Sequence, residues 1–356
     1  MRVTPQQVLQ ALSSVKAAGQ DRDIVALGRV KDLEVGDNRV SFSLQMDPAA
    51  GKANADLLEK ARAMVTALGV ADVRVAVAQQ QKPVSGAAPQ NDALIPGVKT
   101  TIAVASGKGG VGKSTLAVNL AVALSSSGSK TGLMDTDVYG PSVPHLMGSR
   151  SGPVVEGGKI APPVQHGIKM ISMAYFLPPG EAVIWRGPML HKAIHQFLGD
   201  VLWGELDYLV IDLPPGTGDI QLSLSQTIPL TGAVIVSTPQ DVALSVASKA
   251  IAMFNKLNTP ILGIVENMSY YSCPHCGQRE DIFGHGGARA AAERMHLPFL
   301  GEIPLDARIR KESDEGRPMA LDASTAGGKA FREVARAVIE QVRLTQERAG
   351  QEIRIE

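Results

Sequence analysis

The residues best suited to chemistry form a glycine-rich loop directly after the short apolar segment Ile102–Ala105. The loop has the spacing G-x-x-x-x-G-K-S and runs into an Ala- and Leu-rich stretch. Glycines let successive backbone N–H groups turn toward a phosphate, and the start of a helix adds partial positive charge. The pattern therefore predicts a P-loop that binds ATP through Gly107, Lys108, Gly109, Gly110, Val111, Gly112, Lys113, Ser114 and Thr115.

Two side chains of this loop have distinct expected roles. Lys113 would neutralise the β- and γ-phosphates, and the hydroxyl of Ser114 would hold Mg²⁺. A second interpretation uses the same letters, because three of the glycines also give the dinucleotide fingerprint G-x-G-x-x-G, with Asp135 further along the chain. That fingerprint requires neither the Lys113-Ser114 pair nor a second strand that ends in an acidic residue. The sequence has both features, and a P-loop site uses both, so the P-loop is favoured.

Acidic residues close two of the expected strands. Asp135 and Asp137 follow Lys130–Met134, and Asp212 closes Tyr208–Asp212 as a Walker-B aspartate would. Carboxylates at the carboxyl edge of a parallel sheet, beside a P-loop, lie where Mg²⁺ and the attacking water must be. We expect Asp135 and Asp212 to join Ser114 around the metal. The simpler interpretation is that these aspartates cap turns.

The chain contains two cysteines, Cys273 and Cys276, in one C-x-x-C directly after the expected strand Ile261–Glu266. A thiol–disulfide oxidoreductase would need a thioredoxin fold around the pair. A zinc site and a [4Fe–4S] cluster each take four ligands, whereas one chain supplies two thiolates. His275 and His285 are candidates to complete a zinc site, and a homodimer would supply two plus two thiolates for a cluster.

Composition narrows the classes of function. The 356 residues include 35 Lys plus Arg and 35 Asp plus Glu, for a formal charge of +0. This balance does not favour nucleic acid as a partner, and two cysteines exclude a disulfide-rich secreted scaffold. There is neither a signal-like N-terminal segment nor an apolar run of about 18 residues, so we expect a cytoplasmic protein without a membrane partner.

The elements that position these residues fall into two modules. Residues 81–99, rich in Pro, Gly, Ala and Gln, predict a linker. Residues 1–80 combine two helices with strands, one of which alternates apolar and polar residues over Arg39–Met46, so we expect a small α+β domain. Residues 100–345 alternate strands and helices, and residues 346–356 form a polar tail.

The alternation in residues 100–345 predicts an α/β fold with a doubly wound, mostly parallel sheet. The expected strands are Ile102–Ala105, Lys130–Met134, Tyr208–Asp212, Ala233–Ser237, Ile261–Glu266 and Phe299–Gly301. The expected helices are Lys113–Ser127, Met189–Leu202, Val242–Leu257, Ala288–His296 and Gly328–Glu347.

The loop sequence KGGVGK, residues 108–113, resembles the deviant Walker A motif of the MinD/ParA-like ATPases. The resemblance implies that Lys108 crosses a dimer interface to the partner's nucleotide, so that the protein works as a nucleotide-bridged homodimer. It implies that Asp137 orients or activates the attacking water. Asn267, at the end of Ile261–Glu266, resembles the adenine-reading asparagine of that class.

Four motifs in one order, GKGGVGKST, DTDVYGPS, DLPPGTGD and ENMSYYSCPHCG, resemble the Mrp/ApbC family of iron–sulfur cluster carrier ATPases over residues 99–342. The resemblance implies that Cys273 and Cys276 of two subunits hold a labile [4Fe–4S] cluster. The cluster would come from an upstream scaffold and go to apoproteins, with slow ATP hydrolysis coupled to loading or transfer.

Residues 1–80 resemble a MIP18-like domain, although Met46–Ala50 lacks the cysteine that some of its members carry. Two other functions stay open. One is a MinD/ParA-type regulatory or positioning ATPase with a structural zinc or redox C-x-x-C. The other is an electron donor resembling nitrogenase reductase.

Overall fold

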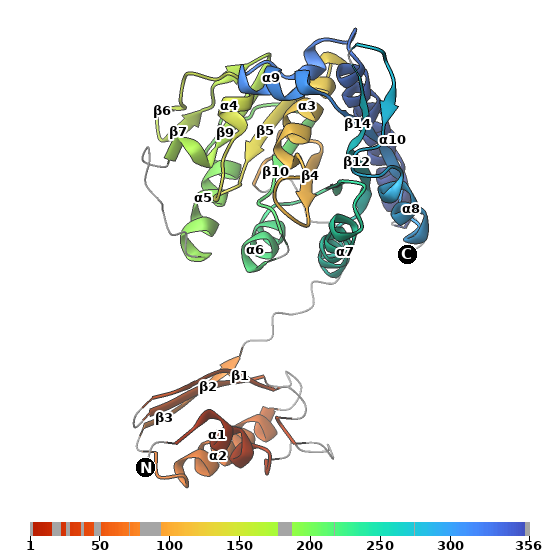
Figure 1. The fold of residues 1–356 in the computed structure, drawn as a ribbon. Coiled ribbons are helices and arrows are strands. Elements are labelled where there is room, and N and C mark those ends of the chain that lie inside the picture. Colours follow the sequence, from red (N-terminus) through yellow and green to blue (C-terminus); the bar gives the residue numbers. More distant parts are fainter. Residues whose placement is uncertain are drawn as a thin grey trace. The chain divides into compact units, whose positions relative to one another are not determined.

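The structure is a computed structural model that describes residues 3–15, 23–25, 29–36, 39–45, 51–70, 72–78, 94–176, 187–216, 218–273 and 275–352. The chain forms two compact units, Met1–Ala88 and Pro89–Glu356 (Figure 1). Residues 81–93 of the expected linker lie outside the described ranges. The end of that linker belongs to the second unit instead, because Ile95 and Val98 are buried in its core.

The first unit is a three-stranded sheet with two helices. Its elements are α1 (Pro5–Leu12), β1 (Val30–Val35), β2 (Arg39–Gln45), α2 (Gly51–Thr66) and β3 (Asp72–Ala78). Strand β2 pairs antiparallel with β1 and parallel with β3. The alternation along β2 buries Val40, Phe42 and Leu44 in the core of this unit.

A nine-stranded sheet forms the centre of the second unit, in the order β13-β12-β11-β4-β10-β5-β9-β8, with β14 beside β12. Among the described strands, β13 and β8 pair antiparallel and the others parallel. The predicted doubly wound, mostly parallel α/β fold is confirmed. The strands are β4 (Thr101–Ser106), β5 (Thr131–Asp135), β8 (Val164–Gln165), β9 (Ile168–Ser172), β10 (Tyr208–Asp212), β11 (Gly232–Ser237), β12 (Ile261–Ser272), β13 (Arg279–Glu280) and β14 (Phe299–Leu305).

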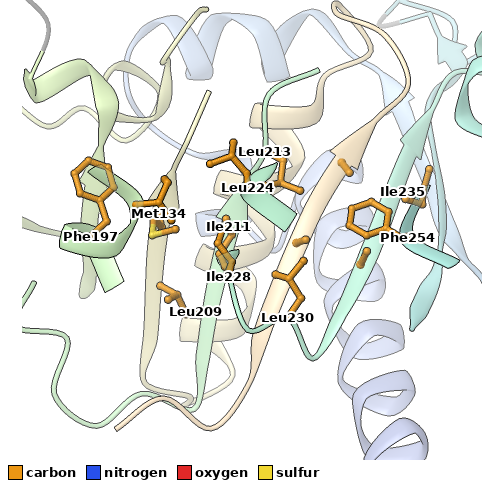
Figure 2. Packing of buried hydrophobic residues seen from close by; sticks show 14 of the residues in the cluster. Met134, Phe197, Leu209, Ile211, Leu213, Leu224, Ile228, Leu230, Ile235 and Phe254 are labelled. Atoms are coloured by element: carbon orange, nitrogen blue, oxygen red, sulfur yellow. The ribbon is translucent and has the colours of Figure 1, made fainter. Parts of the chain in front are cut away.

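Alternate residues of the central strands β4, β10 and β11 are buried on opposite faces of this sheet. Ala103, Ile211 and Ile235 pack in the core shared with α5 (Gly187–Gly199), α6 (Asp219–Thr227), α7 (Asp241–Lys256) and α8 (Gly287–Arg294). Figure 2 shows Ile211 and Ile235 among the buried side chains of this core. Val104, Val210 and Val234 belong to the other core, with α3 (Lys113–Ser126) and α10 (Ala326–Glu352). Neighbouring residues of one strand therefore reach different sets of helices.

The C-terminal residues differ from the expected polar tail. Residues 346–352 continue α10, and residues 353–356 lie outside the described ranges. Arg343 pairs with Glu340 and Glu347 at 2.6 Å each, and such pairs one turn apart support a helix. The remaining elements are α4 (Val143–Leu146), β6 (Val154–Glu156), β7 (Lys159–Ala161), η2 (Met173–Phe176), α9 (Ala307–Asp314) and η3 (Met319–Leu321). None of the described helices combines the length and apolarity that a membrane span requires.

Candidate functional site

The glycine loop lies between β4 and α3, at the carboxyl edge of the sheet. Gly110 and Gly112 have φ values of +80° and +84°, in the left-handed region that favours glycine. The loop borders a cavity of about 250 Å³, and its lining contains all the expected nucleotide-binding loop residues except Gly107 and Val111. The lining residues are Ser106, Lys108, Gly109, Gly110, Gly112, Lys113, Ser114, Thr115, Asp137, Ser142, Leu146 and Pro215. Backbone N–H groups at such a helix start suit a phosphate.

Lys113 lies among carboxylates from neighbouring strand ends. Its Nζ is 2.5 Å from Asp212 Oδ1, 3.5 Å from Asp137 Oδ2 and 3.2 Å from Ser114 Oγ. Burial raises the pKa of Asp212, while Lys113 opposes that effect. The second oxygen of Asp212, Oδ2, is buried without a partner among the described residues. One ammonium thus faces two carboxylates, and a divalent cation would neutralise the remaining charge.

Asp135 is fully buried, and its two oxygens already accept hydrogen bonds. Oδ1 accepts from the backbone N–H of Asp137 at 3.1 Å, and Oδ2 accepts from Ser172 Oγ at 2.8 Å and from the Val143 N–H at 3.2 Å. Burial and the neighbouring Asp212 raise the pKa of Asp135 to about 7. This geometry suits a group that positions the Asp137 turn better than one that binds Mg²⁺ directly.

Asp137 and Lys108 both line the cavity. Asp137 Oδ1 accepts from the N–H groups of Tyr139 and Gly140 at 3.1 and 3.3 Å, so the carboxylate has a fixed orientation. Lys108 is half-buried, and no described residue forms a salt bridge with its ammonium. The described chain therefore leaves this ammonium available for another group.

Asn267 lies against the backbone of the P-loop. Its Nδ2 donates to the carbonyl oxygen of Val111 at 2.8 Å. The approach is so close that a Cβ built on Gly112 would lie 2.1 Å from that nitrogen. Asn267 therefore contacts the loop itself, and its expected contact with adenine stays a prediction.

The two cysteines lie at the turn of a short hairpin between β12 and β13. The Cys273 N–H donates to the Gln278 carbonyl at 2.9 Å, and the Gly277 N–H donates to the Cys273 carbonyl at 2.8 Å. Both thiols are free; Cys273 is half-buried and Cys276 is exposed. The backbone N–H groups of Cys276 and then His275 lower the pKa of the Cys273 thiol. The hairpin thus presents one activated thiol beside an accessible one.

The described residues do not assemble a metal site within one chain. No group of three or more His, Cys, Asp or Glu side chains that could hold a metal occurs among them. His285 contacts Glu302 at 3.1 Å instead, and His275 is exposed. The hairpin therefore offers two thiols and an incomplete ligand set.

Glu266 is a site residue that the sequence analysis missed. Its side chain is fully buried and accepts hydrogen bonds from Ser269 Oγ at 2.6 Å, from the Gly286 N–H at 2.9 Å and from the Ala288 N–H at 2.7 Å. The sequence contains one signal for it, namely an acidic residue at the end of the apolar strand Ile261–Glu266. A carboxylate in such a strand is expected to be buried, and a buried carboxylate needs hydrogen-bond donors around it.

Family models match both units. One described as NUBPL iron-transfer P-loop NTPase matches residues 97–339, and one described as Iron-sulfur cluster assembly protein matches residues 5–77. The curated "Iron-sulfur cluster carrier protein" of Deinococcus radiodurans is 46% identical over 342 residues, which cover 94% of this chain and 95% of that protein.

Solved structures agree with these matches. A nucleotide-binding protein from Archaeoglobus fulgidus in complex with ADP is 44% identical, with a TM-score of 0.58 over 64% of this chain and 90% of that chain. The cell division ATPase MinD of Pyrococcus furiosus shares the fold, with 24% identity and a TM-score of 0.53 over 68% of this chain and 98% of that chain. The chain therefore belongs to the family of NUBPL iron-transfer P-loop NTPases.

Proposed function

We propose that this protein is an ATP-dependent carrier of [4Fe–4S] clusters that works as a homodimer in the reducing cytoplasm. It binds ATP at the P-loop cavity and hydrolyses it slowly. Cys273 and Cys276 of two subunits hold the cluster, which an upstream scaffold supplies and apoproteins receive. The observation that carries the proposal is a pair of free thiols, one half-buried and one exposed, in a chain of this family that also has a P-loop cavity.

The charge in the cavity supports binding of ATP with Mg²⁺. Lys113 and the loop N–H groups suit phosphate oxygens. Ser114 and Asp212 Oδ2, which has no hydrogen-bond partner among the described residues, suit a magnesium ion. Bound Mg²⁺ would offset the negative charge of the phosphates. Asp137, with one oxygen fixed by the Tyr139 and Gly140 N–H groups, is placed to orient the attacking water.

The ligand count supports a shared cluster. A [4Fe–4S] cluster takes four thiolates, and each chain has two cysteines in all. Two hairpins facing each other across a dimer would complete the set. The Lys108 ammonium supports the same assembly, because it lines the cavity, has no salt bridge among the described residues and could reach a partner's nucleotide.

The test is to measure iron, acid-labile sulfide and zinc in anaerobically reconstituted protein of known oligomeric state. We expect about two irons and two sulfides per chain in a dimer, and loss of both in Cys273→Ala. The reconstituted protein should then activate an apoprotein that needs a [4Fe–4S] cluster. A chelator added to the solution should capture iron from the cluster and so reduce the activation of the apoprotein.

Other results would identify other functions. Stoichiometric zinc without sulfide would contradict the carrier role and favour a regulatory or positioning ATPase with a structural metal. A cluster that stays bound through redox cycles and never reaches an acceptor would favour an electron donor.

A further inference from the structure

Two adjacent residues of β12, Glu266 and Asn267, connect the nucleotide cavity with the base of the cysteine hairpin. Adjacent residues of a strand point to opposite faces. The Asn267 side chain reaches the P-loop on the α3 face, where Nδ2 donates to the Val111 carbonyl at 2.8 Å. The Glu266 carboxylate instead reaches the first residues of α8, on the other face.

Glu266 joins the two ends of the segment that carries the cysteines. Ser269, just before the hairpin, and Gly286, just after it, both donate to the same oxygen, Oε1, at 2.6 and 2.9 Å. The Ala288 N–H donates to Oε2 at 2.7 Å. The residues on either side of segment 270–285, which contains both thiols, are therefore hydrogen-bonded to the same buried carboxylate.

A backbone irregularity separates the P-loop contact from the hairpin. Met268, next to Asn267, has φ +57°, a left-handed value that is costly for a residue with a side chain. Against β14, Asn267 pairs with Ile303 and Tyr271 with Leu305, so four steps along β12 match two along its neighbour. Such a bulge can change its geometry at lower cost than a regular ladder, because part of the pairing is already lost.

We infer that Glu266 and Asn267 are positioning residues that couple nucleotide occupancy of the P-loop to the geometry of the Cys273–Cys276 hairpin. Binding at the P-loop shifts the Val111 carbonyl and with it Asn267. The shift passes through the Met268 bulge to Ser269 and, through Glu266, to both ends of the hairpin. The inference rests on the proposed function for the identity of its two ligand sites.

Thiol reactivity provides a test that needs no cluster. The full-length apoprotein is alkylated with iodoacetamide, with and without MgADP or a magnesium complex of a non-hydrolysable ATP analogue. Since the chain has two cysteines, mass spectrometry reads each rate separately. We expect nucleotide to change the Cys273 rate by at least about 5-fold, the lower range of measured couplings.

Two variants interrupt the coupling at different points. Ser269→Ala removes one hydrogen bond to Glu266, and Ser269 is not part of the cavity lining. Asn267→Ala removes the contact with Val111. Each should reduce the nucleotide effect to less than about 2-fold, and Ser269→Ala should keep its nucleotide affinity. The matched control is Thr131→Val, which removes a buried hydroxyl at the first residue of β5. This position lies at the amino edge of the sheet, opposite the P-loop, so the variant should keep the wild-type response.

The outcomes separate this inference from the carrier function. A wild-type nucleotide effect that persists undiminished in both variants overturns the coupling, as does equal loss in Thr131→Val. Absence of any effect in the wild type also overturns it, while the iron and sulfide content still decides the carrier function independently. If Asn267→Ala loses nucleotide binding, Ser269→Ala decides alone.

Discussion

Lys113 Nζ lies 2.5 Å from Asp212 Oδ1, and both side chains are almost completely buried. The two residues stand 99 positions apart in the sequence and meet because β4 and β10 are adjacent parallel strands. Because Lys113 compensates the buried charge of Asp212, a change at this phosphate-binding site should also affect the stability of the fold. A buried pair costs desolvation, and removing one partner leaves an uncompensated charge.

Lys113→Met should lower the stability of the nucleotide-free protein as well as abolish ATP binding. Leaving Asp212 unpaired should cost about 3–5 kcal/mol of the free energy of unfolding, measured by urea denaturation. The double variant Lys113→Met/Asp212→Asn should recover most of that stability without recovering ATP binding. Equal stability of the single and double variants would contradict the argument.

Asp137→Asn should slow ATP hydrolysis by about 10²–10⁴-fold, the usual contribution of a general base. ADP affinity should change little, because the substitution keeps the side chain's size and an oxygen for the Tyr139 and Gly140 N–H groups. The measurement pairs single-turnover hydrolysis with ADP titration. Asp200→Asn, which removes a carboxylate paired with Lys159 at the surface, is the control and should hydrolyse ATP normally. Unchanged hydrolysis in Asp137→Asn would contradict its proposed role.

Lys108→Ala tests whether hydrolysis requires a second subunit. In the wild type, the rate per subunit should rise with protein concentration as dimers form. In Lys108→Ala, we expect a loss of about 10²-fold or more, as for other groups that stabilise transition-state charge, with nucleotide binding retained. Lys256→Ala, at an exposed position of α7, should behave as wild type. A rate independent of concentration in the wild type would argue against the dimer.

Gly112→Ala and Gly110→Ala separate backbone strain from collision. Both glycines have left-handed φ values, which cost about 1–2 kcal/mol for a residue with a Cβ. A Cβ at Gly112 would also collide with Asn267, whereas the space around Gly110 is open. Gly112→Ala should therefore be the more destabilising of the two in urea denaturation. In an Asn267→Ala background, which already lacks the hydrogen bond to Val111, Gly112→Ala should cost about as much as Gly110→Ala costs in the wild type. If the two alanine variants are equally stable, the collision is absent in solution.

The lowered pKa of Cys273 predicts how the alkylation rate of its thiol depends on pH. Since N–H donors stabilise the thiolate, more of this thiol is ionised at neutral pH, and alkylation falls only as the pH drops through the lowered pKa. In the folded apoprotein, the midpoint of the rate against pH should lie below that of the same cysteine in guanidinium-unfolded protein. Coincident midpoints would show that the folded hairpin does not stabilise the thiolate.

The sequence predicts the sheet and the P-loop well because their signals are local. Apolar strands end directly at Asp135 and Asp212, and glycine spacing marks the loop between β4 and α3. The extension of β12 beyond Glu266 is harder to predict, because Asn267 and Ser269 interrupt the apolar pattern. Their partners, Val111 and Glu266, depend on tertiary contacts that spacing alone does not reveal.

The linker boundary shows the same limitation in another form. Pro96 and Gly97 give residues 94–99 a loop-like composition, yet Ile95 and Val98 are buried. A Cβ built on Gly97 would lie 2.4 Å from the Gly204 carbonyl oxygen, so glycine here serves close packing. Composition indicates a break in regular structure and does not distinguish a free segment from a packed one.

The exposure of Cys276 has a consequence for how cargo would leave the protein. In the single chain, solvent reaches the thiol that would form one iron–sulfur bond of each hairpin under the proposed function. An acceptor thiolate can then enter before the carrier's thiolate departs. Release would then proceed by stepwise ligand substitution, with one iron–thiolate bond replaced by another and no change in oxidation state. With exchange of this kind, the rate of delivery would depend on the concentration of the acceptor.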